Sequence, residues 1–122
     1  MIINGREIKF LRTVKATSEL SKICPNGDLS RLPELFTGDL STTLETGAKM
    51  IHFLNEGYEM HKHFEDRSYK PQPLEVDEIM YLEYEEFDKL LASAMNGLNN
   101  GAETTIEVEE PKKKENQEDE GN

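Results

Sequence analysis

The sequence predicts a mainly α-helical domain of about four helices, with a short β-hairpin at its N-terminus and a disordered acidic tail at its C-terminus. Apolar residues recur at helical spacing between residues 17 and 98, and an Asn-Gly pair near the start favours a tight hairpin. The end of the chain is mostly charged. We therefore expect a helical domain over residues 1–101, with the hairpin at residues 1–12, and a disordered tail over residues 102–122.

The expected hairpin consists of Met1–Ile3 and a β-prone run that ends at Leu11. Asn4 and Gly5 lie between these runs, and both residue types tolerate the positive φ angles that a two-residue turn requires. An isolated hairpin is marginally stable in water. We therefore expect this one to pack against the helices.

A first helix is predicted from about Thr17, with Thr17 or Ser18 as its N-cap. The turn Cys24–Gly27 ends it, because proline and Asn-Gly both favour turns. A short helical segment follows, capped by Ser30 and ended by Gly38. The apolar residues of the two segments, which recur at helical spacing, are Ala16, Leu20, Ile23, Leu29, Leu32, Leu35 and Phe36.

The strongest helical pattern covers residues 42–64. Thr42 and Glu45 have the spacing of a capping box, in which each side chain binds a backbone N–H at the start of the helix. Gly47 and Gly57 indicate close approach to this helix, either by a partner or by another part of the chain. Two neighbouring apolar stripes form a wide face that suits the centre of a bundle or a protein interface. The first stripe contains Leu44, Ala48, Ile51, Leu54 or Asn55, and Tyr58. The second contains Met50, Phe53, Gly57, Met60 and Phe64.

A further helix is expected to begin at Val76, after a loop over residues 67–72. Acidic residues near its start would interact favourably with the positive end of the helix dipole. Its second half is residues 84–98, where apolar side chains again recur at helical spacing. Asn96-Gly97 and Asn99–Gly101 predict the end of this helix.

The charge balance argues against nucleic-acid binding. The chain has 14 basic and 25 acidic residues and a formal net charge of −11, whereas duplex binding relies on lysines and arginines. Cys24 is the only cysteine, which excludes an intrachain disulfide and a thiolate-based zinc site. No apolar run of a signal peptide opens the sequence, and no window approaches the roughly 20 apolar residues of a membrane span. We expect a cytoplasmic protein with no membrane or nucleic-acid partner.

Candidate catalytic and metal-binding residues have simpler structural explanations. His61 and His63 are two residues apart on a helix, so they point in directions about 200° apart rather than toward one ion. The carboxylates between Glu83 and Asp88 fit a solvated helix face better than a glycosidase pair in a cleft. Cys24 lies in a turn, and the phosphate-binding, serine-nucleophile and HExxH motifs do not occur. We therefore expect no catalytic residue, metal or cofactor, and a protein that is not an enzyme.

The order of the elements resembles a known protein family. A short hairpin, a helix, a Cys-Pro-Asn-Gly-Asp turn and a long amphipathic helix precede the phrase PLEVDEIMYLEYEEFDKLLASAMNGLNNG and a charged tail. This layout resembles that of the tail assembly chaperones of siphophages and prophages of Gram-positive bacteria. The resemblance covers residues 1–100. It is most specific over residues 74–98, where a Leu-x-Val-x-Glu-Ile-like start leads to Glu-Glu-Phe-x-x-Leu-Leu.

The resemblance implies a non-catalytic chaperone of phage tail assembly. Members of the family bind the long, aggregation-prone tape measure protein and help to recruit tail tube subunits. They act in the host bacterial cytoplasm and are absent from the mature virion. Many are also made as a longer frameshifted product, and the run Lys112–Lys114 is a candidate slippage site. Self-association of the chain stays open.

We expect partners to bind exposed parts of the long helix and of the last helix. Aromatic and methionine side chains are adaptable anchors for helical partners, although each could instead complete the core. The candidates are Tyr58, Met60, Phe64, Tyr81, Tyr84 and Phe87. Two other functions stay open. One is a structural phage connector or tail completion protein that remains in the virion, and the other is an acidic inhibitor or DNA mimic.

Overall fold

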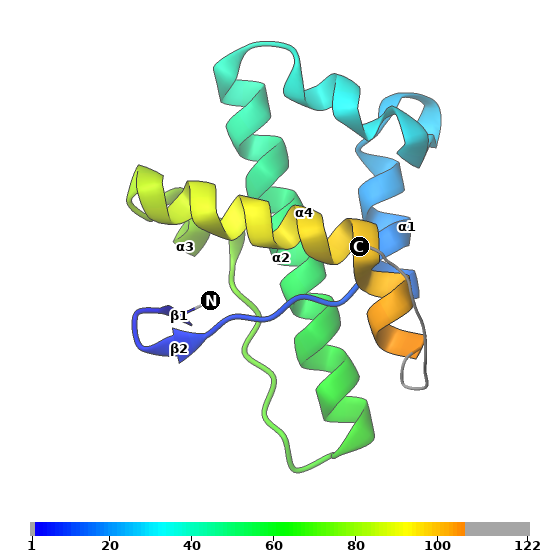
Figure 1. Ribbon diagram of the computed structural model, residues 1–122, viewed down its shortest axis with the longest axis vertical. Helices are drawn as coiled ribbons and strands as arrows, with labels where there is room; N and C mark the ends of the chain where they lie inside the picture. Colours follow the sequence, from blue (N-terminus) through cyan, green and yellow to red (C-terminus); the bar gives the residue numbers. More distant parts are fainter. Residues whose placement is uncertain (1, 107–122) are drawn as a thin grey trace.

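The fold is mainly α-helical, as the sequence predicts, with a two-stranded antiparallel hairpin near the N-terminus (Figure 1). The computed structural model describes the backbone of residues 2–106 and the side chains of residues 2–99. Most of the predicted disordered tail, residues 107–122, lies outside this part of the chain. In chain order the elements are the strands β1 (Ile2–Ile3) and β2 (Arg6–Glu7), the α-helix α1 (Val14–Lys22), the 3₁₀ helices η1 (Pro25–Gly27) and η2 (Leu29–Phe36), and the α-helices α2 (Leu40–Glu65), α3 (Val76–Met80) and α4 (Tyr84–Ile106).

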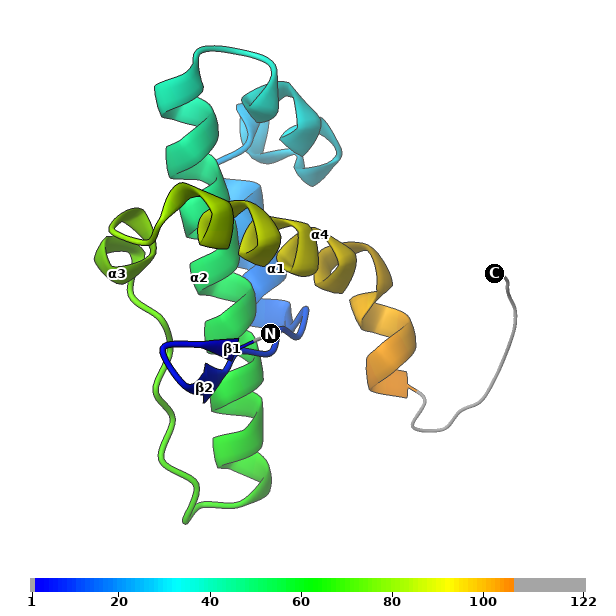
Figure 2. The same cartoon turned by 60° about the vertical axis from the view of Figure 1, so that its left-hand side comes forward.

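The long helix α2 is the centre of the domain (Figures 1 and 2). Helix α4 crosses it, and α1, α3 and η2 also contact it. Apolar side chains from these elements and from the hairpin region form one core, and its largest fully buried members are Ile8, Leu20, Met50, Ile51, Leu54, Ile79 and Leu90. Among the helices of residues 2–106, none combines the length and the apolar character of a membrane span.

The hairpin forms at the predicted Asn-Gly turn. Asn4 and Gly5 have φ angles of 52° and 77°, values that fit a type I′ turn. Each strand has only two residues, so the paired part is much shorter than the predicted hairpin over residues 1–12. Ile3 and Ile8 are buried in the core, which gives this short hairpin the packing that it needs.

The chain that follows the hairpin crosses α2 at close range. The backbone N–H of Leu11 donates to the carbonyl oxygen of Leu54 at 3.0 Å. Gly57 makes this crossing possible, because a Cβ there would lie 2.5 Å from the carbonyl oxygen of Leu11. At Gly47 a Cβ would lie 3.1 Å from Cζ of Phe87, where α4 crosses α2. Both glycines of α2 therefore serve packing within the chain.

A row of polar side chains on α2 holds the segment that returns from the end of α2 to α3. The row consists of His52, Asn55, Glu59 and His63, and each of these side chains bonds to residues 69–74. Their spacing keeps them within about 80° of one another around the helix axis. We call these four side chains the polar row. They interrupt the apolar stripes that the sequence shows on the same helix.

The first two side chains of the polar row, His52 and Asn55, bind both backbone groups of Leu74. Its N–H donates to Oδ1 of Asn55 at 2.7 Å, and its carbonyl oxygen lies 2.6 Å from Nδ1 of His52. A carbonyl oxygen only accepts, so Nδ1 of His52 carries the proton. Asn55 also donates through Nδ2 to the carbonyl oxygen of Lys9 at 2.9 Å. This fully buried amide therefore joins α2 to two extended segments.

The third side chain of the polar row, Glu59, has a buried carboxylate that binds the returning segment. Its Oε1 accepts hydrogen bonds from the Tyr69 hydroxyl at 2.8 Å and from the backbone N–H of Gln72 at 2.9 Å. Burial and the hydrogen bond to Glu59 raise the pKa of Tyr69. The guanidinium of Arg6 lies 4.0 Å from Oε2 of Glu59 and donates to the carbonyl oxygen of Gln72. The carboxylate thus ties the hairpin to the returning segment.

Three helices begin earlier than predicted. Their N-caps are Thr13, Asp28 and Asp39, in place of the predicted Thr17 or Ser18, Ser30 and Thr42. The capping box predicted for Thr42 is therefore wrong, because the N–H of Thr42 itself donates to Asp39 at 3.0 Å. Val14 and Leu40, which open α1 and α2, are exposed. Apolar periodicity marks where a helix is buried, so it misses exposed residues at the start of a helix.

The region after residue 75 differs from the prediction in two respects. Residues 81–83 divide it into α3 and α4. Helix α4 then continues through Asn96-Gly97 and Asn99–Gly101 to Ile106, so the predicted helix end is wrong. Gly97 lies against the side chain of Phe10, where a Cβ would be 3.0 Å from the Cβ of that residue. The glycine thus fits a packing contact, which outweighs its weak helix propensity.

Candidate interaction surfaces

An exposed aromatic surface lies where α3 meets α4. Tyr81 is 90% exposed, Tyr84 is 61% exposed and Met80 is 43% exposed. We call these three side chains the elbow patch. Met80 and Tyr84 also border a depression of about 100 Å³, whose other lining residues are Leu44, Ile79, Leu82 and Phe87.

The local structure explains why the elbow patch faces outward. Helix α3 begins at Val76, where the backbone N–H of Glu75 donates to Oε1 of Glu78 at 3.0 Å, as in a capping box. Ile79 is buried and fixes the side of α3 that faces the core. The next two residues are rotated away from that side by about 100° and 200°. Met80 and Tyr81 are consequently exposed.

Carboxylates flank the elbow patch along the chain. Residues 75–88 contain seven acidic side chains and no lysine or arginine. They are Glu75, Asp77, Glu78, Glu83, Glu85, Glu86 and Asp88. All except the partly buried Glu86 are exposed, and none of the seven forms an ion pair with another described residue.

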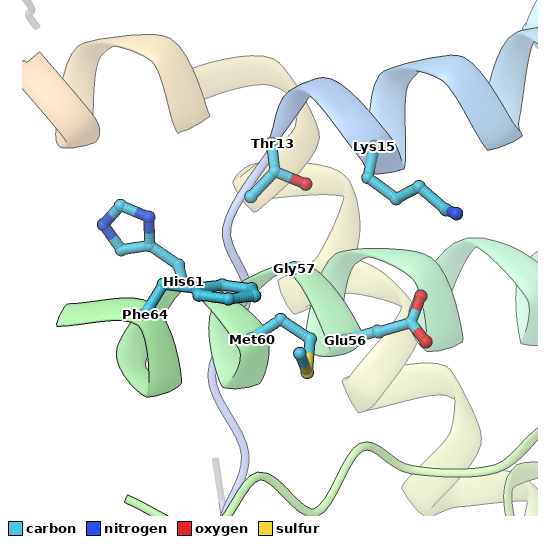
Figure 3. A pocket seen from close by; sticks show the side chains of 7 residues that line it. All are labelled: Thr13, Lys15, Glu56, Gly57, Met60, His61 and Phe64. Atoms are coloured by element: carbon cyan, nitrogen blue, oxygen red, sulfur yellow. The ribbon is translucent and has the colours of Figure 1, made fainter. Parts of the chain in front are cut away.

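A second surface is a groove of about 460 Å³ between the start of α1 and the second half of α2 (Figure 3). We call it the α1–α2 groove, and its lining residues are Thr13, Lys15, Glu56, Gly57, Met60, His61 and Phe64. Phe64 is 61% exposed, and the guanidinium of Arg67 lies 4.8 Å from the centre of its ring. Basic and acidic side chains both border this groove, so it favours neither sign of charge.

A third surface was not expected from the sequence. A groove of about 480 Å³ lies between η2 and α4, and it is lined by Arg12, Leu29, Ser30, Leu32, Pro33, Phe36, Met95, Leu98 and Asn99. Arg12 fixes one part of it by donating to the carbonyl oxygen of Leu98 at 3.4 Å. The apolar spacing of residues 29–36 is visible in the sequence. It does not reveal that α4 lies opposite, because the two segments are far apart in the sequence and only the fold brings them together.

The predicted binding residues divide between separate surfaces. Met60 and Phe64 line the α1–α2 groove, whereas Tyr81 and Tyr84 belong to the elbow patch. Tyr58 is on neither surface. It is partly buried, and Nζ of Lys9 lies 5.9 Å from the centre of its ring.

Phe87 is not exposed, contrary to its place among the predicted surface residues. It is 5% exposed and packs over Gly47, which has no side chain to keep α4 at a distance. The expectation that Phe87 belongs to an accessible binding surface is therefore wrong. Its ring instead closes the core where α4 crosses α2 and forms part of the wall of the depression at the elbow patch.

The histidines and the cysteine have local partners. Nε2 of His61 lies 3.2 Å from Oε2 of Glu65, and Nδ1 of His63 lies 2.8 Å from the carbonyl oxygen of Tyr69. Cys24 is buried, and burial raises the pKa of its thiol, which disfavours the nucleophilic thiolate. Within the described residues, no group of three His, Cys, Asp or Glu side chains is placed to hold a metal ion.

Comparison of the chain with protein-family models, curated proteins and solved structures gave no match. Inference about function therefore depends on the three surfaces and on the resemblance seen in the sequence. Exposed aromatic side chains beside apolar depressions are the usual anchors of protein–protein contacts. Of the three surfaces, the elbow patch has the most exposed aromatic side chains, and the residues that flank it in the chain, 75–88, carry a single sign of charge.

Proposed function

We propose that the protein is a bacteriophage tail assembly chaperone, which binds the tape measure protein and helps to recruit tail tube subunits without catalysing a reaction. It would act in the cytoplasm of the host bacterium and be absent from the mature virion. One observation carries the proposal. Tyr81 and Tyr84 are exposed, and they lie within residues 74–98, the part of the chain that most specifically resembles this family.

The physical properties of the surface support such a role. Aromatic and methionine side chains bind apolar helix faces through adaptable contacts, and a partner helix can pack into a groove on the chaperone. The elbow patch and the α1–α2 groove both present such side chains. A net charge of −11 would keep a complex with an aggregation-prone helical protein in solution.

Co-expression with the tape measure protein of the same phage, a very long helical protein, tests the proposal. We expect the soluble fraction of the long protein to rise and the two chains to purify together. The chain with Tyr81→Ala and Tyr84→Ala should give less of the complex. Unchanged solubility of the long protein, together with the absence of a complex, would refute the proposal.

Mass spectrometry of purified phage particles distinguishes the chaperone from a structural connector. An assembly chaperone leaves before the particle is complete, so its peptides should be absent or far below the amount of any tail protein. Peptides of this chain in amounts equal to those of a tail component would favour the connector instead.

A further inference from the structure

The elbow patch carries an inference about the chemistry of its partner. Tyr81, Tyr84 and Met80 are exposed on one corner of the domain, where α3 meets α4. Figure 2 shows the two helices meeting at an angle beside α2. The depression between them is lined only by apolar and aromatic side chains and is about the size of one apolar side chain. An exposed apolar surface of this kind is a candidate docking site.

The charges around the elbow patch determine which partner fits. Residues 75–88 carry seven negative charges and no positive charge, and none of these carboxylates forms an ion pair with another described residue. The N-termini of α3 and α4 attract some of them, but each helix end contributes only about +0.5 elementary charge. Two helix ends therefore offset about one of the seven charges. The remaining negative potential is available to a cationic partner.

We infer that the elbow patch binds a lysine- or arginine-rich amphipathic helix of another protein. One apolar side chain of that helix would enter the depression, and cationic side chains one turn away would reach the carboxylates. The exposed rings of Tyr81 and Tyr84 also attract cations through their faces. The inference deepens the proposed function, on which it rests for the elbow patch as the binding surface, by naming the chemistry of the partner. Its test uses no phage protein, so the inference and the proposed function can fail separately.

The same charges argue against other occupants. A nucleic acid or an acidic protein segment would place like charges beside residues 75–88. A second copy of this chain would do the same if the two elbow patches faced each other. The α1–α2 groove, in contrast, has Lys15 beside Glu56 and makes no such distinction. It therefore serves as the comparison surface in the test.

Titration with two matched synthetic peptides tests the inference. Both have about 18 residues, or five helical turns, with leucines on one face. One peptide has lysines on the other face and the second has glutamates. We expect the full chain to bind the lysine peptide, more weakly as ionic strength rises, and not to bind the glutamate peptide. Binding of both peptides, or of neither, would overturn the inference.

Variants locate the binding site. The double variant Tyr81→Ala and Tyr84→Ala should bind the lysine peptide at least about tenfold more weakly, as expected for the loss of interface anchors. The double variant Met60→Ala and Phe64→Ala changes the α1–α2 groove and should bind as the parent does. The opposite pattern would overturn the inference. Circular dichroism of each variant ensures that the comparison is between folded proteins.

Two charge variants separate specific binding from general attraction. Glu83→Gln with Glu85→Gln should weaken binding about tenfold, whereas Glu19→Gln with Glu34→Gln on α1 and η2 changes the net charge equally and should weaken it much less. Equal weakening by both pairs would mean nonspecific attraction and would overturn the inference.

The chain's own lysines are the remaining alternative occupant. Replacing all three residues of Lys112–Lys114 with alanine should change the affinity for the lysine peptide only slightly, through the net charge. If these lysines occupied the elbow patch, their removal would strengthen binding about tenfold or more, and the inference of a partner from another protein would be wrong.

Discussion

The side chain of Asn55 joins α2 to two other parts of the chain. Its amide group accepts from the backbone N–H of Leu74 and donates to the carbonyl oxygen of Lys9, while its own backbone belongs to α2. In the sequence this residue shares a helix face with Ile51, and the apolar pattern includes either Asn55 or its neighbour Leu54 in the stripe. Amide groups have the donor and acceptor that two passing backbones require.

We predict that Asn55→Ala lowers the free energy of unfolding by about 2–4 kcal/mol, because it leaves the buried N–H of Leu74 and carbonyl oxygen of Lys9 without partners. Urea unfolding followed by circular dichroism measures this change. Asn96→Ala, at an exposed position of α4, is the control and should change stability by less than about 0.5 kcal/mol. A similar small effect at both positions would contradict the role assigned to Asn55.

At the scale of the elements, packing rather than local sequence decides several boundaries. The helical pattern of α2 is long and strongly periodic, so its position could be predicted within two residues at either end. The start of α1 could not, because Val14 and Lys15, its first two residues, are exposed and do not belong to the apolar stripe. The continuation of α4 past Gly97 depends on a contact with Phe10, which lies far away in the sequence.

The two glycines of α2 give a prediction about packing. Alanine favours a helix over glycine by roughly 1 kcal/mol. At Gly57, however, the new Cβ would lie 2.5 Å from the backbone oxygen of Leu11. We expect Gly57→Ala to lower the free energy of unfolding by about 1–3 kcal/mol despite the better propensity.

Gly47→Ala is the matched control for this prediction. Its Cβ would meet the ends of the Phe87 and Leu91 side chains at 3.1 and 3.3 Å, and side-chain ends can shift more easily than backbone. Thermal and urea unfolding of both variants should therefore show a smaller loss at residue 47 than at residue 57. An equal or larger loss at residue 47 would mean that the crossing near Leu11 is not the tighter contact.

Asp39, the N-cap of α2, predicts a dependence of stability on pH. Its carboxylate accepts a hydrogen bond from the backbone N–H of Thr42 and another from the Thr42 hydroxyl, and these bonds lower the pKa of Asp39. A carboxylate whose pKa is lower in the folded state stabilises the fold above its unfolded pKa of about 3.9. That contribution is lost as the pH falls through the folded pKa.

The variant Asp39→Asn keeps a capping oxygen but has no titrating group. The parent should therefore have a higher melting temperature than this variant at pH 7, and the difference should be smaller at a pH below the unfolded pKa of about 3.9. Ser41→Ala, which removes an uncharged group from the same turn, should differ from the parent equally at both pH values. If the difference between the parent and Asp39→Asn did not depend on pH, the capping role of the carboxylate would be contradicted.

At the scale of the whole molecule, the candidate site could be predicted only in part. Tyr81 and Tyr84 are expected on the surface and lie there. Phe87 follows Tyr84 by three residues and shares its helical stripe, so the sequence pattern cannot separate a surface residue from a core residue in this pair. The separation depends on Gly47, which admits the ring of Phe87 where α4 crosses α2.

The functional account places partner binding on the elbow patch of a small helical domain. Co-purification with the tape measure protein, followed by light scattering to determine the mass of the complex, tests this most directly. The parent chain and the Met60→Ala, Phe64→Ala variant should both form the complex, and the Tyr81→Ala, Tyr84→Ala variant should form much less of it. The account would be contradicted by a parent chain that forms no complex, or by an elbow variant that forms as much complex as the parent.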